Sequence, residues 1–124
     1  MTINMQRIQT IIEKLASISS VQGELTRLAF SAEDEVAHNY LIELCKPYDL
    51  AIRRDEIGNL FIRKSGVEDH LAAVAFGSHI DTVVNAGKFD GPLGSVGGLE
   101  ILFQLCEQGV QTRYPLELII FTCE

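Results

Sequence analysis

Two apolar segments with the composition of buried β-strands constrain the fold more than any other feature of this chain. Residues 71–77 and 116–122 are nearly continuous apolar runs, and a stretch with helical spacing lies between them. Strands of this kind, separated by helices, are typical of parallel sheets that helices cover. The sequence therefore predicts an α/β fold: a layered, largely parallel sheet flanked by helices.

Helix signals divide the rest of the chain. Apolar residues recur at helical spacing over residues 4–18, which predicts a first helix. Ser31 has the character of an N-cap for a second helix, which Pro47 closes. Pro92 suits the first turn of a third helix, and Gly109 suits its C-terminal end.

A turn-rich stretch at residues 55–59 lies between two short strand-like segments and predicts a β-hairpin. No internal repeat, low-complexity tract or linker divides the 124 residues, which is the length of one ordinary domain.

Charge and composition exclude several classes of function. The net charge is −7, and the ten Lys and Arg residues are scattered without a basic stripe, which argues against nucleic acid and anionic membranes as partners. No apolar run approaches the length that crosses a bilayer, and the charged N-terminal segment is unlike a signal peptide. We therefore expect a cytoplasmic protein.

The scattered Cys and His residues are interpreted as structural. Three cysteines at wide spacing, without a CxxC motif, argue against a disulfide framework or a zinc knuckle. We expect Cys45 and Cys106 to be buried thiols, His38 to lie on the polar flank of its helix, and His70 to end a hydrophilic loop.

Four residues with metal-binding or acid–base chemistry follow the two apolar strands. His79 and Asp81 come after residues 71–77, Asp90 lies at the entrance of the third helix, and Glu124 follows the last strand. Sites in α/β sheets form beyond the carboxyl ends of the strands. The topology therefore predicts that His79, Asp90 and Glu124 meet at one edge.

This set suits a hydrolytic metal site. His79 can supply an imidazole ligand, and Asp81 is close enough in sequence to orient that ring. Asp90 lies between Gly87 and Gly91, which allow a tight turn around a cation, and its carboxylate could bridge two metals. Glu124 could exchange a proton with water and a leaving nitrogen.

Other interpretations of the same residues stay open. Taken singly, each of the four could be an ordinary hydrogen-bonding, turn or terminal residue. A phosphate-binding loop is disfavoured because GxxxxGK[ST] and GxGxxG are absent. Nucleophilic catalysis is disfavoured because no serine lies in a GxSxG elbow.

Several motifs resemble a known family. GSHIDTV, GKFDGPLG, GGLEILFQL and IIFTCE are similar to the amidase branch of the di-zinc aminopeptidase-like hydrolases. That branch contains N-carbamoyl-L-amino-acid hydrolases, allantoate amidohydrolases and β-ureidopropionases. Upstream, GELTRLAFSAED and DEIGNLFIRKSG extend the resemblance over essentially the whole chain.

The resemblance implies a metal-dependent amidohydrolase that cleaves linear C–N bonds of N-carbamoyl amino acids or ureido acids. It implies two divalent ions, zinc or manganese, with His79 as a ligand of one ion and Asp90 bridging both. Asp81 matches the acid behind the His, and Glu124 matches the general base.

The family's remaining ligands and its dimerisation domain would lie downstream of residue 124. The resemblance therefore implies that residues 1–124 are the N-terminal portion of a zinc-aminopeptidase-like catalytic domain, from an enzyme that forms a homodimer. Two alternatives remain. The chain could be an inactive fragment or folding domain, or a related peptidase or aminoacylase. The second is disfavoured because only eleven positions separate His79 from Asp90.

Overall fold

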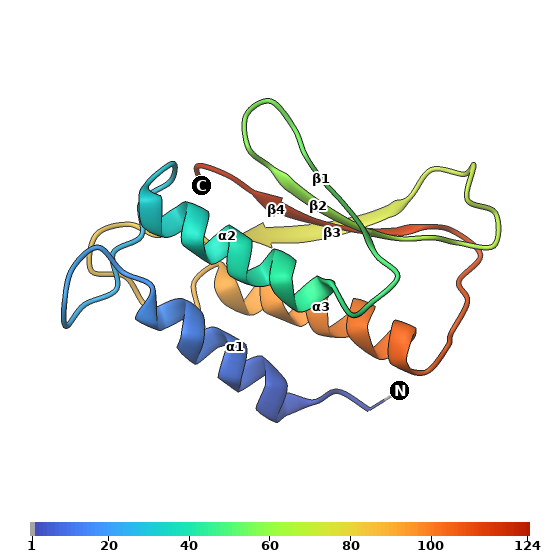
Figure 1. Cartoon of the computed structure of the whole chain (residues 1–124), viewed down its shortest axis with the longest axis horizontal. Coiled ribbons are helices and arrows are strands. Elements are labelled where there is room, and N and C mark those ends of the chain that lie inside the picture. Colours follow the sequence, from blue (N-terminus) through green and yellow to red (C-terminus); the bar gives the residue numbers. More distant parts are fainter. Residues whose placement is uncertain (1) are drawn as a thin grey trace.

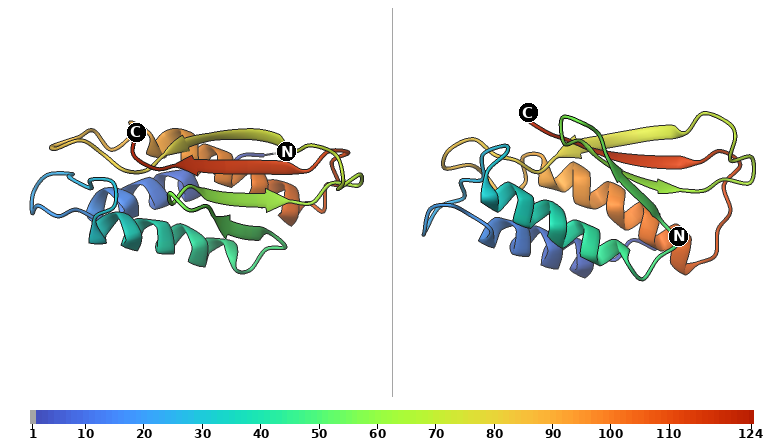
Figure 2. Two further views of the ribbon diagram at one scale, coloured as in Figure 1. Left: turned by 90° about the horizontal axis from the view of Figure 1, so that it is seen from above. Right: turned by 45° about the horizontal axis from the view of Figure 1, so that its top comes forward.

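The computed structural model describes residues 2–124 as one sheet with three helices on one of its faces (Figures 1 and 2). The elements in chain order are α1 (Met5–Ser17), α2 (Ala32–Cys45), β1 (Ala51–Arg54), β2 (Leu60–Lys64), β3 (Val74–His79), α3 (Pro92–Glu107) and β4 (Leu116–Phe121). The layered α/β fold and the hairpin are confirmed.

The sheet is mixed, and the prediction of a largely parallel sheet is wrong. Its strand order is β1-β2-β4-β3. β3 and β4 are parallel, with α3 as their connection, whereas β1–β2 and β2–β4 are antiparallel. The tight hairpin turn makes β1 and β2 antiparallel, and β2 then joins the same sheet beside β4. β3 is left at one edge.

Local capping explains where the helices begin. The Ser31 side chain accepts a hydrogen bond from the backbone N–H of Asp34, as the sequence predicts, and Asn4 accepts one from the N–H of Arg7 at the start of α1. Pro92 is the first residue of α3. The N-terminus of α3 is thereby placed just beyond β3, where the predicted site lies.

The core lies between the sheet and the helices. α1 contributes its apolar stripe, α3 contributes most of one face, and β2 and β4 contribute the side chains that point toward the helices. The fully buried members include Leu15, Leu41, Leu60, Ile62, Leu99, Leu102, Leu118 and Ile120. Burying each such side chain contributes about 1.5–3 kcal/mol before the entropy of folding is counted.

A glycine lets α3 approach the sheet closely. A Cβ atom at Gly98 would lie 2.7 Å from Cδ1 of Leu118 and 3.0 Å from a ring carbon of Phe76. The glycines near the start of α3 lower helix propensity. At this position the absence of a side chain is what permits the packing against β3 and β4.

The prediction that His38 lies on the polar flank of α2 is wrong. His38 is 1% exposed and belongs to the buried face of the helix, together with Ala37 and Leu41. Burial of the imidazole is possible because its Nδ1 lies 2.9 Å from the backbone oxygen of Asp34, one turn earlier. His70 is exposed, as expected.

Of the two thiols expected to be buried, Cys45 is buried and Cys106 is half-buried. Burial raises the pKa of the Cys45 thiol to about 12. Within residues 2–124 no helix combines the length and apolar character needed to span a bilayer.

Candidate functional site

All four candidate residues line one pocket of about 210 Å3 beyond the carboxyl ends of β3 and β4. The topology brings His79, Asp90 and Glu124 together, as the sequence predicts, and Asp81 lies with them two residues after His79. The complete lining is His79, Asp81, Thr82, Val83, Ala86, Asp90 and Glu124.

His79 is the last residue of β3, because that strand covers 74–79 instead of the predicted 71–77. Its backbone oxygen accepts a hydrogen bond of 2.9 Å from Oγ of Ser95 on α3. Its ring Nδ1 lies 2.9 Å from the backbone oxygen of Asp81. Because a carbonyl oxygen only accepts, Nδ1 carries the proton in the neutral ring and Nε2 is left with its lone pair.

Asp90 lies on the side of the imidazole that carries Nε2. Its Oδ1 is 3.9 Å from Nε2 of His79, and the side chain is 85% exposed. The next residue, Gly91, has a φ of +87°, and a Cβ atom there would lie 2.5–2.7 Å from the imidazole. Only glycine therefore allows the chain to turn this closely beneath His79 and into α3.

Asp81 lies on the side of the imidazole that carries Nδ1, and its side chain is buried, with the residue 3% exposed. Its Oδ2 accepts a hydrogen bond of 3.2 Å from the backbone N–H of Glu124, which ties the segment after β4 to the pocket. Its Oδ1 is 3.7 Å from Nδ1 of His79 and has no hydrogen-bond partner among residues 2–124. Burial raises the pKa of this carboxyl, and the nearby His79 opposes the rise.

The donor set fits part of a metal site. Nε2 of His79 has a free lone pair and faces a carboxylate oxygen 3.9 Å away, and a small rotation of the exposed Asp90 would let both reach one cation. No group of three or more His, Cys, Asp or Glu side chains within residues 2–124 is placed to hold a metal ion. These residues therefore supply two donors and not a closed coordination shell.

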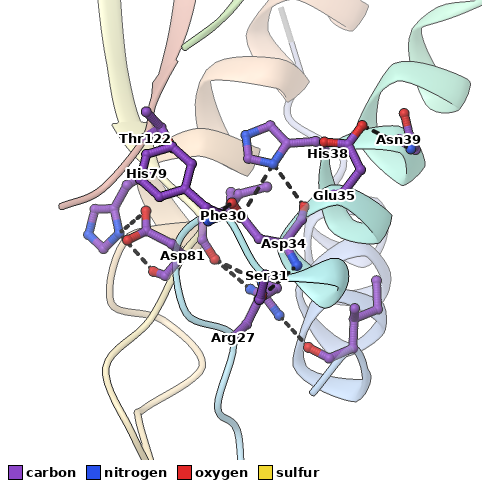
Figure 3. Close-up of polar contacts among 12 residues, drawn as sticks. Arg27, Phe30, Ser31, Asp34, Glu35, His38, Asn39, His79, Asp81 and Thr122 are labelled. Carbon is purple, nitrogen blue, oxygen red and sulfur yellow. Dashed lines mark hydrogen bonds and ion pairs between the residues drawn. The ribbon is translucent and has the colours of Figure 1, made fainter. Parts of the chain in front are cut away.

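A buried polar cluster supports the segment from His79 to Thr82, and it was not predicted from the sequence. Figure 3 shows Asp34 and His38 on α2, His79 at the end of β3 with Asp81 beyond it, and Arg27 below them. Arg27 is 0% exposed, which is exceptional for this residue type. Its place in the apolar sequence LTRLAF was the one available signal of that burial.

The chain is similar to known hydrolases over nearly its whole length. It is 80% identical over 124 residues to an uncharacterized hydrolase of Haemophilus influenzae, 41% identical over 118 residues to a ureidoglycolate hydrolase of Oryza sativa, and 40% identical over 102 residues to an N-carbamoyl-L-amino acid amidohydrolase of Geobacillus stearothermophilus. These matches cover 100%, 94% and 82% of this chain. They cover 30%, 24% and 25% of the relatives, so the chain spans less than a third of their length.

Solved structures show the same relationship. A hydantoinase/carbamoylase family amidase of Burkholderia multivorans superposes with a TM-score of 0.93 at 31% identity, over 98% of this chain and 30% of that one. No family model matches the sequence. Over nearly its whole length the chain is thus homologous to amidases of the hydantoinase/carbamoylase type, and the resemblance seen in the motifs is confirmed.

Proposed function

We propose, from this homology to hydantoinase/carbamoylase amidases, that the chain supplies part of the active site of an amidohydrolase. The substrates are N-carbamoyl amino acids or related ureido acids, the compounds that appear in the names of its relatives. The observation that carries the proposal is the pocket itself. His79, Asp81, Asp90 and Glu124 line it together, in a chain that aligns with such hydrolases almost end to end.

His79 and Asp90 would hold two divalent ions, zinc or manganese, with Asp90 as a ligand of both. When bound, such ions would supply Lewis acidity that polarises the scissile carbonyl. Two donors do not complete such a site, so further ligands must come from outside residues 2–124. On this proposal residues 1–124 correspond to the N-terminal portion of the catalytic domain.

Glu124 is proposed as the general base. Water adds to the substrate carbonyl as Glu124 takes its proton, the C–N bond then breaks, and Glu124 returns the proton to the leaving nitrogen. The hydrogen bond from its backbone N–H to Asp81 supports this role because it holds Glu124 at the pocket. Asp81 is proposed to orient His79, through its backbone oxygen and the carboxylate behind the ring.

The test uses the full-length gene product with a panel of allantoate, N-carbamoyl amino acids and β-ureidopropionate. Glu124→Gln should retain metal, measured by elemental analysis, yet lose turnover by about 10²-fold or more. Asp90→Ala should lose both metal and turnover. Glu56→Gln, at an exposed position in the hairpin, is the matched control and should keep both. Unchanged turnover in Glu124→Gln would remove that residue from the role.

A second proposal concerns the 124 residues by themselves. Because they place only two donors together, we propose that this chain alone binds zinc weakly and hydrolyses none of the panel. Stoichiometric zinc after gel filtration, together with measurable hydrolysis, would contradict it.

A further inference from the structure

Arg27 holds the segment that carries His79 and Asp81, and it does so from a fully buried position. Its Nε and Nη2 both donate to the backbone oxygen of Ile80, at 3.0 and 2.7 Å. Ile80 is the residue between His79 and Asp81, so the fork grips the backbone at the turn that separates them. A planar guanidinium can donate from two nitrogens to one oxygen, whereas the ammonium of lysine has a single nitrogen.

The main chain of Arg27 contacts Thr82, two residues further along the same segment. The backbone N–H of Thr82 donates to the oxygen of Arg27 at 2.7 Å, and Oγ1 of Thr82 accepts from the N–H of Arg27 at 2.8 Å. Ile80 and Thr82 flank Asp81 on both sides. The orientation of the Asp81 carbonyl therefore depends on four hydrogen bonds, two to Ile80 and two with Thr82, that all belong to Arg27.

The other end of the guanidinium is anchored on a helix. Nη1 donates to the backbone oxygens of Leu15 and Ile18 at the C-terminal end of α1, where the helix dipole favours a cation. The carboxylates of Asp34 and Asp81 are the nearby charges that oppose the cost of burying Arg27. Arg27 thus connects a fixed helix end to the turn after β3.

We propose that Arg27 is a positioning residue for His79. By holding Ile80 and Thr82, it directs the Asp81 carbonyl at Nδ1 of His79 and so keeps Nε2 unprotonated and facing Asp90. The inference rests on the proposed function only where it takes the lone pair on Nε2 of His79 to bind a metal. The orientation itself can be measured without metal or substrate.

The test follows the His79 tautomer in the 15N-labelled 124-residue chain at about pH 8, where imidazoles are neutral. Two-bond 1H–15N correlation spectra distinguish the tautomers, and a His79→Gln sample assigns the signal. The native chain should show the Nδ1–H tautomer alone. Arg27→Lys keeps the charge but loses the fork, and it should show both tautomers of His79 in comparable amounts.

Arg7→Lys is the matched control. Arg7 also carries a guanidinium, but it lies on α1 and pairs with Glu100 and Glu107 in the C-terminal half of α3, away from His79. It should lower the melting temperature and leave the tautomer unchanged. If Arg27→Lys does not fold, Thr82→Val removes the hydroxyl that accepts from the Arg27 N–H and donates to the oxygen of Val83, and it should shift the tautomer in the same direction.

A pure Nδ1–H tautomer in every folded Arg27 and Thr82 variant would overturn the inference. Its failure is distinguishable from failure of the proposed function. A mixed tautomer in Arg27→Lys, with no hydrolysis by the full-length protein, would leave the inference standing and remove the function. Hydrolysis by the full-length protein, together with an unchanged His79 tautomer in Arg27→Lys, would leave the proposed function standing and remove the inference.

Discussion

Two polar clusters lie toward opposite ends of α3. Each contains a carboxylate buried to nearly the same extent, but the two carboxylates differ in their hydrogen-bond partners. The closed cluster consists of Arg7, Tyr48, Glu100, Gln104 and Glu107, and the open cluster consists of His79, Asp81, Asp90 and Glu124. Glu100 is 1% exposed and Asp81 is 3% exposed. Burial is therefore not what distinguishes these two carboxylates.

The difference lies in the hydrogen-bond partners. Glu100 accepts from Arg7 Nε at 2.6 Å, from Gln104 Nε2 at 2.8 Å and from the N–H of Asn4 at 2.9 Å. Burial alone would raise the pKa of Glu100, but these donors outweigh it and lower the pKa. In the open cluster one oxygen of Asp81 has no such partner, and burial raises the pKa of that carboxyl. The closed cluster fixes helices, whereas the open one keeps lone pairs available.

The largest effect should come from opening the closed cluster. Arg7→Met leaves the buried carboxylate of Glu100 without its ion pair and should lower the free energy of unfolding by about 3–5 kcal/mol. Urea unfolding measures this. Lys46→Met removes an exposed pair with Glu43 and should change stability by less than about 1 kcal/mol. Equal losses in both variants would contradict the comparison.

A smaller effect should come from crowding the open cluster. Gly91→Ala forces a side chain into the left-handed region and against the His79 ring, so it should cost about 1–3 kcal/mol and move the His79 ring resonances. Gly87→Ala, where a Cβ atom meets nothing within 4 Å, is the control. Unmoved His79 signals in the Gly91 variant would show that the turn relaxes elsewhere.

The closed cluster should also set the response to acid. The hydrogen bonds from Arg7 and Tyr48 lower the pKa of Glu107, and the pKa of Glu100 is lowered as well. The native state then binds fewer protons than the unfolded state, so this stability is present above the ordinary Glu value of about 4.3 and is lost as pH falls through the lowered values.

Urea unfolding at a series of pH values between about 6 and 3 measures this dependence. Glu107→Gln should flatten the slope, because it removes one of the two groups. A slope identical to that of the native chain would place the acid sensitivity in other carboxylates.

The smallest effect should come from Asp81→Asn. The amide keeps an oxygen for the N–H of Glu124 and removes a poorly partnered buried carboxylate, so the free energy of unfolding should change by less than about 1 kcal/mol, in either direction. The same change at Glu100 should cost more, because Glu100→Gln weakens the hydrogen bond from Arg7. Thermal melts of the pair test the contrast directly.

Features governed by neighbouring residues could be predicted from the sequence. The cap at Ser31, the start of α3 at Pro92 and the hairpin all depend on a few adjacent positions. The convergence of His79, Asp90 and Glu124 followed from strand ends and topology alone. The direction of β2 beside β4 depends instead on pairs such as Leu60 with Ile120, sixty positions apart, which spacing cannot reveal.

The buried contacts of Arg27 that support the site could not be predicted from the sequence, for the same reason. The oxygens that satisfy Arg27 belong to Leu15, Ile18 and Ile80, and only the folded chain brings them around one guanidinium. The prediction for His38 was wrong because the backbone oxygen of Asp34 within α2 bonds to its Nδ1, which allows a polar ring to face the core. The roles of His79, Asp81, Asp90 and Glu124 stay predictions.

The position of β3 in the strand order has a consequence for handling the molecule. β3 pairs only with β4 among residues 2–124, and it contains no Lys, Arg, Asp, Glu or Pro. Charges and prolines are the usual means by which an exposed strand resists adding a second strand. Concentrated solutions of this chain should therefore associate edge to edge through residues 74–79, and a lysine introduced at Ala75 should suppress that growth.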